Sequence, residues 1–250
     1  MNIIIPMAGL GSRFRAAGYS IPKPLIPILG KPMYAWAADC LPLDQGKSLI
    51  FVLLASQPEF QELREDILQR YARYRPAVLS VPELTAGQAV TVLTARDLIN
   101  SEEPLLIHNS DTAFKVDHGW VDDVMGCRAD GALLVFKSNE KRWSYSRATV
   151  DGWVAEVREK EVISDSASTG TYWFRRGADF VRIAERRLKD EQRDAGEFYV
   201  APLYNELIEE GGRVKNYWIE RLLCFGTPED LARTLEMLSH NEPPTRMINS

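Results

Sequence analysis

The sequence has little cysteine, no dense run of basic residues and no long hydrophobic segment. Its three cysteines, Cys40, Cys127 and Cys224, stand far apart, with no paired spacing and no neighbouring histidine. This pattern is typical of reduced thiols and argues against a disulfide framework or a cysteine-ligated metal site. A chain of this length buries roughly 70% of the surface that it exposes when unfolded, so it needs no disulfide bonds.

The charge balance excludes two classes of partner. The formal net charge is −5, with 45% hydrophobic and 26% charged residues, so a nucleic acid or an anionic membrane is not expected as the main partner. The N-terminal run 1–5 lacks basic residues and is too short for the apolar core of a signal peptide, and no later segment approaches a membrane span. We therefore expect a cytoplasmic protein, and the sequence does not set its oligomeric state.

Apolar runs of strand length alternate with helical patterns through the first half of the chain. The expected strands are Asn2–Pro6, Ser48–Ala55, Ala77–Val81, Pro104–His108 and Gly131–Lys137. The expected helices are Met33–Leu41, Glu59–Tyr74, Gln88–Ile99 and Trp120–Cys127. This order, with short connections, predicts an α/β protein with a Rossmann-like, doubly wound, mostly parallel sheet.

The second half changes character and predicts an antiparallel extension of that sheet. Tyr145–Val150 and Trp153–Glu159 are expected to form a hairpin around Asp151-Gly152, which is a favoured tight turn. A further strand is expected at Thr169–Phe174, and helices at Ala178–Leu188, Val200–Glu210 and Pro228–Ser239. We expect one domain over residues 1–250, with ligands bound beyond the carboxyl ends of the parallel strands.

A glycine-rich loop, MAGLGSRF at residues 7–14, follows the first expected strand. Its glycines let the backbone approach a phosphate and point successive N–H groups at it. Phe14 stands where a dinucleotide-binding loop has its third glycine, and the G-K-[ST] ending of an ATPase loop is absent. Instead, Arg13 lies in the loop and Lys23 follows between two prolines that restrict the backbone. An ordinary turn with surface charges is the alternative, but the full set favours a triphosphate site.

This G-x-G-x-R loop followed by P-K-P resembles the signature of the sugar-phosphate nucleotidyltransferases, the NDP-sugar pyrophosphorylase superfamily. Later motifs recur in the same order, so the resemblance covers nearly the whole chain. It implies the nucleotide-diphospho-sugar transferase fold and an enzyme in which Arg13, Lys23 and Lys160 are catalytic. The nucleotide-binding residues that it implies are Ala8, Gly9, Leu10, Gly11, Ser12, Arg13, Lys23, Gly87, Gln88 and Asn109.

Two motifs in the first half support this resemblance. In LTAGQA, residues 84–89, a glycine at a helix start leaves room for a flat ring, although a plain helix start is the alternative. Asp111 ends the apolar strand LLIHNSD, where a helix cap or a turn is the alternative. Mg²⁺ prefers one or two carboxylates together with phosphate oxygens. The resemblance implies that Gly87 and Gln88 contact the base and that Asp111 binds Mg²⁺.

The second half carries the motifs of an acceptor site. The Glu-Lys-Glu of residues 159–161 would ordinarily be solvated. Glu197, which precedes an expected helix, would ordinarily complement the dipole of that helix. The family, however, has an E-K pair followed by G-x-Y-x-F, which residues 170–174 supply as GTYWF. It implies that the lysine reaches the phosphate of the acceptor. The acceptor-binding residues implied in this way are Lys160, Gly170, Glu197 and Tyr199.

The segment CFGTPED, residues 224–230, departs from the family pattern D-x-G-T-P. The aspartate of that pattern is a second metal ligand in the family, and the thiol of Cys224 is a poor ligand for Mg²⁺. Two arrangements stay open. Either Asp111 and phosphate oxygens hold the metal, or another acid such as Glu197 or Glu220 contributes.

Together these motifs predict transfer of a nucleoside monophosphate from an NTP to a phosphorylated small molecule, with release of pyrophosphate. Residues 1–137 are expected to bind the nucleotide and residues 138–250 the acceptor. The base, from CTP, UTP, dTTP or GTP, is not readable. The family in general acts on sugar 1-phosphates, which are therefore the expected acceptors. The departures Ile5-Pro6-Met7-Ala8, Asn109-Ser110-Asp111 and Cys224 resemble capsule-associated members, which implies an NDP-activated precursor of surface polysaccharide. The alternatives are a CTP-dependent cytidylyltransferase acting on phosphocholine or a phosphorylated amino-acid amide, and a nucleotide-binding regulator without turnover.

Overall fold

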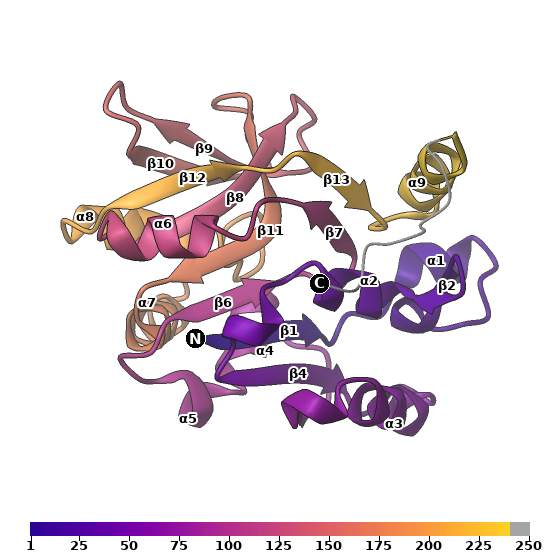
Figure 1. The fold of residues 1–250 in the computed structure, drawn as a ribbon. Helices are drawn as coiled ribbons and strands as arrows, with labels where there is room; N and C mark the ends of the chain where they lie inside the picture. Colours follow the sequence, from indigo (N-terminus) through magenta and orange to yellow (C-terminus); the bar gives the residue numbers. More distant parts are fainter. Residues whose placement is uncertain (241–250) are drawn as a thin grey trace.

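A computed structural model describes residues 1–240 of the chain (Figure 1). Its centre is a nine-stranded sheet in which β10, β9, β11, β6, β1, β4 and β5 are neighbours in that order, while β8 pairs with β11 and β12. The strands are β1 (Asn2–Met7), β4 (Ser48–Leu54), β5 (Ala77–Val81), β6 (Leu105–His108), β8 (Gly131–Lys137), β9 (Ser144–Ala148), β10 (Val154–Glu159), β11 (Ser166–Phe174) and β12 (Val214–Trp218).

Strand β1 lies in the middle of the parallel part of the sheet, between β4 and β6. Its side chains alternate between the two faces, so Ile4 enters one hydrophobic cluster while Ile3 and Ile5 enter another. Both faces are therefore buried, which is why this strand is a continuous apolar run.

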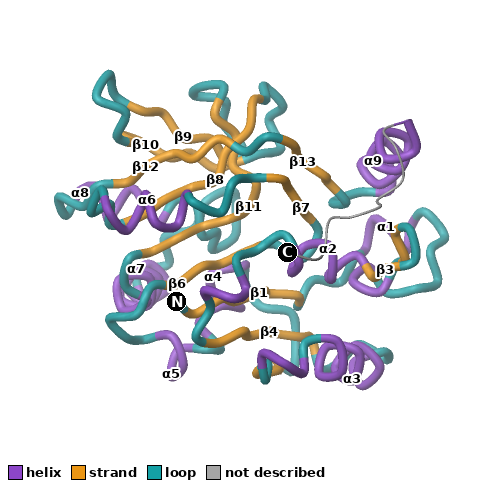
Figure 2. The backbone as a smooth tube through the Cα atoms, in the orientation of Figure 1, coloured by secondary structure: helices purple, strands orange, loops and turns teal. Residues whose placement is uncertain are grey.

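Helices cover both faces of the sheet (Figures 1 and 2). One hydrophobic cluster contains side chains of α4, α5, α7 and α8, and the other contains side chains of α2, α3 and α6. The helices are α1 (Ser12–Ala16), α2 (Met33–Asp39), α3 (Phe60–Arg70), α4 (Gln88–Leu93), α5 (Arg96–Ile99), α6 (Trp120–Gly126), α7 (Gly177–Lys189), α8 (Leu203–Glu209) and α9 (Pro228–His240). The doubly wound arrangement predicted from the sequence is confirmed.

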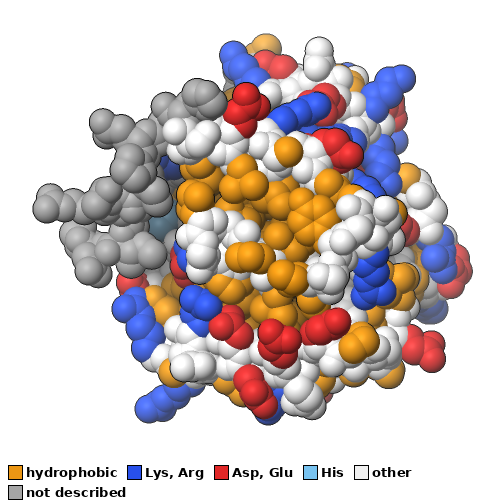
Figure 3. Space-filling model, turned by 90° about the vertical axis from the view of Figure 1, so that its right-hand side faces the viewer, with side chains coloured by type: hydrophobic (Ala, Val, Ile, Leu, Met, Phe, Trp, Pro, Cys, Tyr) orange, Lys and Arg blue, Asp and Glu red, His pale blue; other side chains and the backbone are white. Residues whose placement is uncertain are grey.

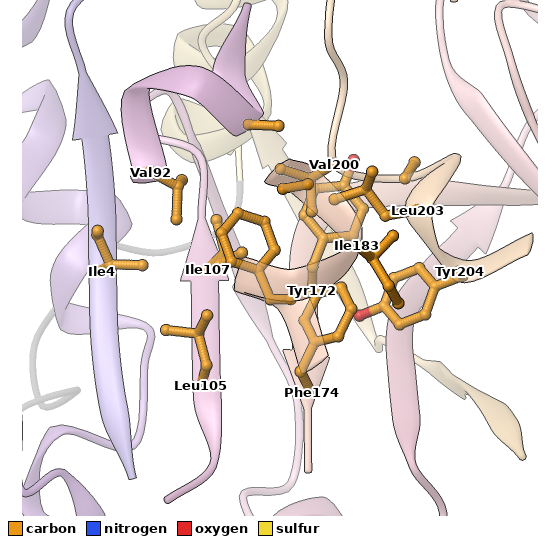
Figure 4. Close-up of a cluster of buried hydrophobic side chains, with 14 of the residues drawn as sticks. Ile4, Val92, Leu105, Ile107, Tyr172, Phe174, Ile183, Val200, Leu203 and Tyr204 are labelled. Atoms are coloured by element: carbon orange, nitrogen blue, oxygen red, sulfur yellow. The ribbon is translucent and has the colours of Figure 1, made fainter. Parts of the chain in front are cut away.

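The first of these clusters joins the two halves of the chain. Figure 4 shows Ile4 and Ile107 of the parallel strands beside Tyr172 and Phe174 of β11, with Tyr204 of α8 next to them. The rings of Phe174 and Tyr204 are stacked with centroids 4.6 Å apart. Such a shared core fixes the position of the second half relative to the parallel sheet.

The second half adds the antiparallel strands that the sequence predicted. β11 runs antiparallel to β6, and β9 and β10 form a hairpin in which Gly152 takes the left-handed φ of 81° that the Asp151-Gly152 turn requires. The mixed, mostly parallel sheet with an antiparallel extension is therefore confirmed.

Several expected elements differ from those observed. The expected helix 88–99 is broken between α4 and α5, where the N–H groups of Thr94 and Ala95 bond three residues back instead of four. The expected helix 59–74 gives way to a 3-10 turn after Arg70, and α8 begins only after Pro202, which has no N–H to donate.

Five strands were missed because each is short, with two to five residues. β12 was one of them, and β7 (Thr112–Lys115) and β13 (Arg221–Cys224) pair with each other away from the main sheet. A second small pair, β2 (Pro27–Ile28) and β3 (Lys31–Pro32), follows α1. Within residues 1–240, no helix is long and apolar enough to cross a membrane.

The side of the molecule that carries α1 and α9 has hydrophobic side chains gathered at its centre, with charged side chains around them (Figure 3). The exposed large hydrophobic residues near α1 are Leu10, Tyr19, Ile21 and Leu29. They lie on the segment that connects β1 to α2, so this segment has apolar side chains on its outer surface.

Candidate active site

A pocket of about 480 Å³ opens beyond the carboxyl ends of β1 and β6. Its lining falls into two sets, which we name by their place in the chain. The first-half wall consists of lining residues between Pro6 and Thr112, and the second-half wall of lining residues between Arg142 and Asp230. The pocket thus lies where ligands bind in open α/β sheets.

Most of the residues predicted from the sequence meet in this pocket. Those that line it are Gly9, Gly11, Ser12, Arg13, Lys23, Gln88, Asn109, Asp111, Lys160, Gly170, Glu197 and Tyr199. The structure does not place Ala8, Leu10 or Gly87 in the lining. Ala8 is buried beneath the loop, and the side chain of Leu10 points into solvent with an exposed fraction of 43%.

The loop after β1 leaves main-chain donors available. Among the described residues, the N–H groups of Gly9, Leu10 and Gly11 donate no hydrogen bond. Gly11 has a left-handed φ of 63°, and a Cβ there would lie 2.9 Å from the Cβ of Lys23. Glycine at this position therefore lets the loop turn tightly and brings Lys23 against it.

The two cations of the first-half wall differ in whether their side chains have partners. The side chain of Arg13 is exposed and forms no hydrogen bond or ion pair with any described residue. Lys23 instead donates from Nζ to Oδ2 of Asp111 over 2.5 Å and to the carbonyl of Gly226 over 3.2 Å. It lies at the start of a 3-10 turn, Lys23–Leu25, rather than in the extended segment that the flanking prolines suggested.

Asp111 is held in its charged form by this contact. Burial by itself would raise the pKa of the carboxyl group, but the adjacent Lys23 ammonium outweighs burial, and the pKa lies below its ordinary value. An ionised carboxylate is therefore present in the pocket at neutral pH.

Asn109 connects the two walls. Its side-chain oxygen accepts a hydrogen bond of 2.5 Å from Gln88, and its main-chain N–H donates to the carbonyl of Gly170 over 3.1 Å. Gly170 has a φ of 82°, and a Cβ there would lie 2.1 Å from Nδ2 of Asn109. Glycine is required at residue 170 by both its backbone and this close approach.

A close backbone contact, which the sequence did not reveal, explains why residue 87 is a glycine. A Cβ at this position would lie 2.6 Å from the main-chain N and O of Phe198. The N–H of Ala89 donates to the carbonyl of Phe198, and the N–H of Phe198 donates to the carbonyl of Ala86. Gly87 therefore lets the segment before Tyr199 pack directly on the start of α4.

The second-half wall carries Lys160 and a buried acid. Nζ of Lys160 donates to the hydroxyl of Tyr199 over 2.6 Å and lies 4.8 Å from the centre of its ring. The neighbouring Glu159 accepts a hydrogen bond from the Ser144 hydroxyl, and burial raises the pKa of this glutamate above its ordinary value. The wall thus has a cation and a carboxyl group that is more easily protonated than usual.

The sequence did not predict a charged pair within the second-half wall. Arg142 donates from Nη1 to Oδ2 of Asp230 over 2.6 Å, and both residues line the pocket. Asp230 lies in the first turn of α9, where an acid is ordinary, and Arg142 lies in a loop with no recognisable motif. The pair forms between residues 88 apart in the chain, so only the fold brings it together.

The chemistry at Cys224 fits its interpretation as a poor metal ligand. Burial raises the pKa of its thiol to about 12, so the thiol stays protonated at neutral pH. Glu220 does not line the pocket and pairs with Lys115 over 2.8 Å, while Glu197 lines it. Asp230 is a further acid near the predicted metal ligand, since Asp111 and Asp230 both line the pocket beside Gly226.

The donor set fits a Mg²⁺ ion that also binds phosphate. A Cβ at Gly226 would lie 3.7 Å from Oδ2 of Asp111 and 3.6 Å from Oδ2 of Asp230, so both carboxylates face the space that this glycine leaves. Within residues 1–240, no group of three or more His, Cys, Asp or Glu side chains is placed to hold a metal. Mg²⁺ needs only one or two carboxylates when phosphates and waters complete its shell.

Residues 2–219 match the family described as nucleotidyl transferase. The chain belongs to this family. The resemblance to the NDP-sugar pyrophosphorylase superfamily is therefore confirmed, and so is the prediction that the chain is of the nucleotidyltransferase class.

Similar chains of known function include nucleotidyltransferases of several kinds. The chain is 28% identical over 242 residues to UTP–glucose-1-phosphate uridylyltransferase AglF of Haloferax volcanii, covering 92% of this chain and 93% of that one. It is 24% identical to the bifunctional protein GlmU of Methanococcus maripaludis and 28% identical to the 2-C-methyl-D-erythritol 4-phosphate cytidylyltransferase of a Synechococcus strain. These matches cover 87% and 68% of this chain, but only 50% and 62% of the two relatives.

Solved structures confirm the fold of this family. A nucleoside-diphosphate-sugar pyrophosphorylase from Vibrio cholerae superposes with a TM-score of 0.80 at 25% identity, over 94% of this chain and 99% of that one. A UDP-glucose pyrophosphorylase superposes with a TM-score of 0.76 at 15% identity, over 96% of this chain and 99% of that one. The predicted nucleotide-diphospho-sugar transferase fold is therefore confirmed.

Proposed function

We propose that the protein transfers a nucleoside monophosphate from an NTP to a phosphorylated small molecule and releases pyrophosphate. One observation carries this proposal. The side chain of Arg13 and the N–H groups of Gly9 and Gly11, none of which has a partner within residues 1–240, lie in one pocket with the Lys23–Asp111 pair, and Lys160 lies on the opposite wall. Two groups of cations on two walls suit two anionic substrates.

In this proposal the two halves of the chain divide the substrates. Residues 1–137 bind the nucleotide, with Arg13, Lys23 and the loop amides holding the triphosphate and Gln88 and Asn109 near the nucleoside. Residues 138–250 bind the acceptor, with Lys160 on its phosphate and Gly170, Glu197 and Tyr199 around the rest.

The chemical step needs no general base. A phosphate oxygen of the acceptor attacks the α-phosphorus of the NTP, a P–O bond forms, and the bond to the bridging oxygen breaks so that pyrophosphate leaves. The acceptor phosphate has a second pKa of about 6 and is mostly ionised at neutral pH. Bringing two polyanions together is the main difficulty, so the residues of the pocket act by positioning and by neutralising charge.

Mg²⁺ fits this reaction as a cofactor. When bound, it would neutralise phosphate charge and orient the phosphates for attack. Asp111 is the residue proposed to hold it, with phosphate oxygens and waters completing its shell. The thiol of Cys224 is protonated and does not contribute.

A sugar 1-phosphate is the proposed acceptor. The Haloferax volcanii relative, whose name specifies glucose 1-phosphate, supports it, as does the Vibrio cholerae nucleoside-diphosphate-sugar pyrophosphorylase at 25% identity. The product would be an NDP-activated sugar, and the resemblance to capsule-associated members supports its use in a surface polysaccharide. A cytidylyltransferase acting on a non-sugar phosphate is a second candidate, because one relative is a cytidylyltransferase of a phosphorylated polyol.

An assay of pyrophosphate release tests these candidate functions together. The protein would be incubated with each of CTP, UTP, dTTP and GTP, with Mg²⁺, and with a panel of sugar 1-phosphates, phosphocholine and phosphorylated amino-acid amides. We expect pyrophosphate from one base with one class of acceptor. Tight NTP binding without pyrophosphate across the whole panel would instead support a regulator without turnover.

A further inference from the structure

We propose that Arg142 binds the phosphate of the acceptor together with Lys160, and that Asp230 positions its guanidinium group. This inference rests on the proposed function and assigns a phosphate-binding residue that has no counterpart among the predicted site residues. It follows from the contacts of Arg142, from its place next to Lys160 and from the burial of Asp230.

The guanidinium group of Arg142 is fixed on three sides. Nη1 donates to Oδ2 of Asp230 over 2.6 Å, Nε lies 2.8 Å from Oε2 of Glu140, and the group lies 4.3 Å from the ring centre of Trp143. A side chain held by two carboxylates and an aromatic ring has little rotamer freedom to lose when a ligand binds.

This arrangement leaves donors for a ligand. A guanidinium group has five N–H donors, and the contacts of Arg142 with Asp230 and Glu140 use one on Nη1 and one on Nε. Both N–H groups of Nη2 donate to no described residue. Because Arg142 lines the pocket and its side chain is 36% exposed, these donors are accessible to a phosphate.

Arg142 and Lys160 are held by the same piece of backbone. The N–H of Lys160 donates over 3.0 Å to the carbonyl of Trp143, the residue next to Arg142. This bond is at the open end of the β9–β10 hairpin, on the second-half wall. The two cations therefore lie on the acceptor side, whereas Arg13, Lys23 and the loop amides supply the triphosphate side.

The phosphate of the acceptor offers more hydrogen-bond acceptors than Lys160 can satisfy alone. A phosphate monoester carries about −1.5 to −2 charges at neutral pH and has three terminal oxygens. Lys160 supplies one positive charge. The charge of Arg142 is already balanced by Asp230 and Glu140, so its contribution is the set of N–H donors that its planar guanidinium group still offers to phosphate oxygens.

Asp230 is the residue that places Arg142. Its side chain is only 5% exposed, it lies in the first turn of α9, and the Thr227 hydroxyl caps its main-chain N–H over 3.1 Å. A buried carboxylate that is paired with the guanidinium group and fixed at a helix end is a rigid anchor for this arginine.

The first test separates the two substrates kinetically. Initial rates would be measured with the NTP and acceptor found in the panel described above, each varied at a saturating level of the other. Arg142→Gln is expected to raise the KM of the acceptor by about 10- to 100-fold, with less than about a threefold change in the KM of the NTP. Arg142→Lys should recover part of the loss, since it keeps the charge without the planar pair of donors.

The controls address folding and surface charge. Arg142→Gln leaves the buried Asp230 unpaired, so the double variant Arg142→Gln/Asp230→Asn is measured with it, and thermal unfolding is recorded for both. The acceptor KM should be raised equally in the two. Arg147→Gln removes an arginine of β9 that pairs with Glu156 outside the pocket, and it should leave both KM values unchanged.

The outcomes distinguish this inference from the proposed function. An active wild type whose acceptor KM is the same in Arg142→Gln would overturn the role of Arg142 alone. A wild type inactive across the panel would overturn the proposed function. In that case calorimetric titration with inorganic phosphate decides: binding weakened at least about tenfold by Arg142→Gln, but retained by Arg13→Ala, supports the subsite. Equal binding by wild type and Arg142→Gln would refute it.

Discussion

The two walls of the pocket are assembled in different ways. The first-half wall takes its loop amides, Arg13 and Lys23 from one short stretch, residues 9–23, and Arg13 has no partner among the described residues. The second-half wall gathers residues from 142 to 230, and its charged groups already have partners: Lys160 bonds to Tyr199 and Arg142 to Asp230. One wall is open to an anion, while the other is organised before any ligand arrives.

The pKa values of the carboxyl groups in the two walls are shifted in opposite directions. The pKa of Asp111 is lowered by Lys23 against the effect of burial, whereas burial raises the pKa of Glu159. A metal ligand needs the first property. The second suits a group that donates or accepts hydrogen bonds from a polyhydroxylated or amine-bearing molecule without adding a full charge beside its phosphate.

Loss of the open cation should have the largest effect. Arg13→Ala and, separately, Asp111→Asn are expected to lower kcat/KM by roughly 100- to 1000-fold, because each removes charge stabilisation at the reacting phosphates. Pyrophosphate release measures the rate, and circular dichroism checks the fold. Arg15→Ala is the matched control, since this exposed neighbour does not line the pocket. Near wild-type rates in both site variants would contradict the assignment of the first-half wall.

The next largest effect is expected from replacing Gly170, where the two walls are in contact. Gly170 and Gly152 have nearly the same left-handed φ, 82° and 81°, but only Gly170 has a neighbour where a Cβ would stand. Alanine at either position costs about 1–2 kcal/mol for its backbone. The clash with Asn109 should add about 1–3 kcal/mol at Gly170 and lower turnover. Urea unfolding measures both, and equal losses of stability in the two variants would show that the close approach is unimportant.

The raised pKa of Glu159 predicts a moderate effect of pH on stability. The folded protein prefers the protonated form, so the free energy of unfolding falls as pH rises from the ordinary glutamate pKa of 4.5 through the raised value. Glu159→Gln removes this term. The variant should therefore gain stability relative to the wild type at pH 7, and the gain should vanish below pH 4.5. Denaturant unfolding of the wild type and of Glu159→Gln at each pH across this range checks it, and an equal stability of the two proteins at every pH would contradict it.

The smallest effect is expected at Tyr199. Tyr199→Phe keeps the ring beside Lys160 and removes only the hydroxyl that accepts its hydrogen bond. A single hydrogen bond of this kind is worth about 1–2 kcal/mol at most when the lysine can turn to solvent. We expect the acceptor KM to rise less than about tenfold. A larger loss, comparable with that of Arg13→Ala, would mean that the hydroxyl itself contacts the reacting groups.

The sequence predicted the first-half wall better than the second for a physical reason. Gly11, Arg13 and Lys23 are close in the chain, and their spacing alone determines that they meet around one turn. The buried strands β1, β4 and β8 were also predictable, because apolar runs covered on both faces leave a clear pattern. The predicted bounds of β5 and β8 agree with those observed.

The pairing of Arg142 with Asp230 has no such local signal. Each residue is unremarkable in its own segment, and the contact depends on the β9–β10 hairpin and α9 meeting across the pocket. The edge strands β12 and β13 were missed for a related reason, since their pairing with β8 and β7 supplies the order that their mixed composition does not predict. The role of Gly87 beneath Phe198 likewise depends on a contact between distant segments.

A crystal structure with a non-hydrolysable NTP analogue and Mg²⁺ tests the central claim most directly. We predict the triphosphate against the main chain of residues 9–13, with Arg13 on a phosphate and Lys23 moved from Asp111 towards the ligand. An analogue bound well away from that turn, with the Lys23–Asp111 pair unchanged, would contradict the account.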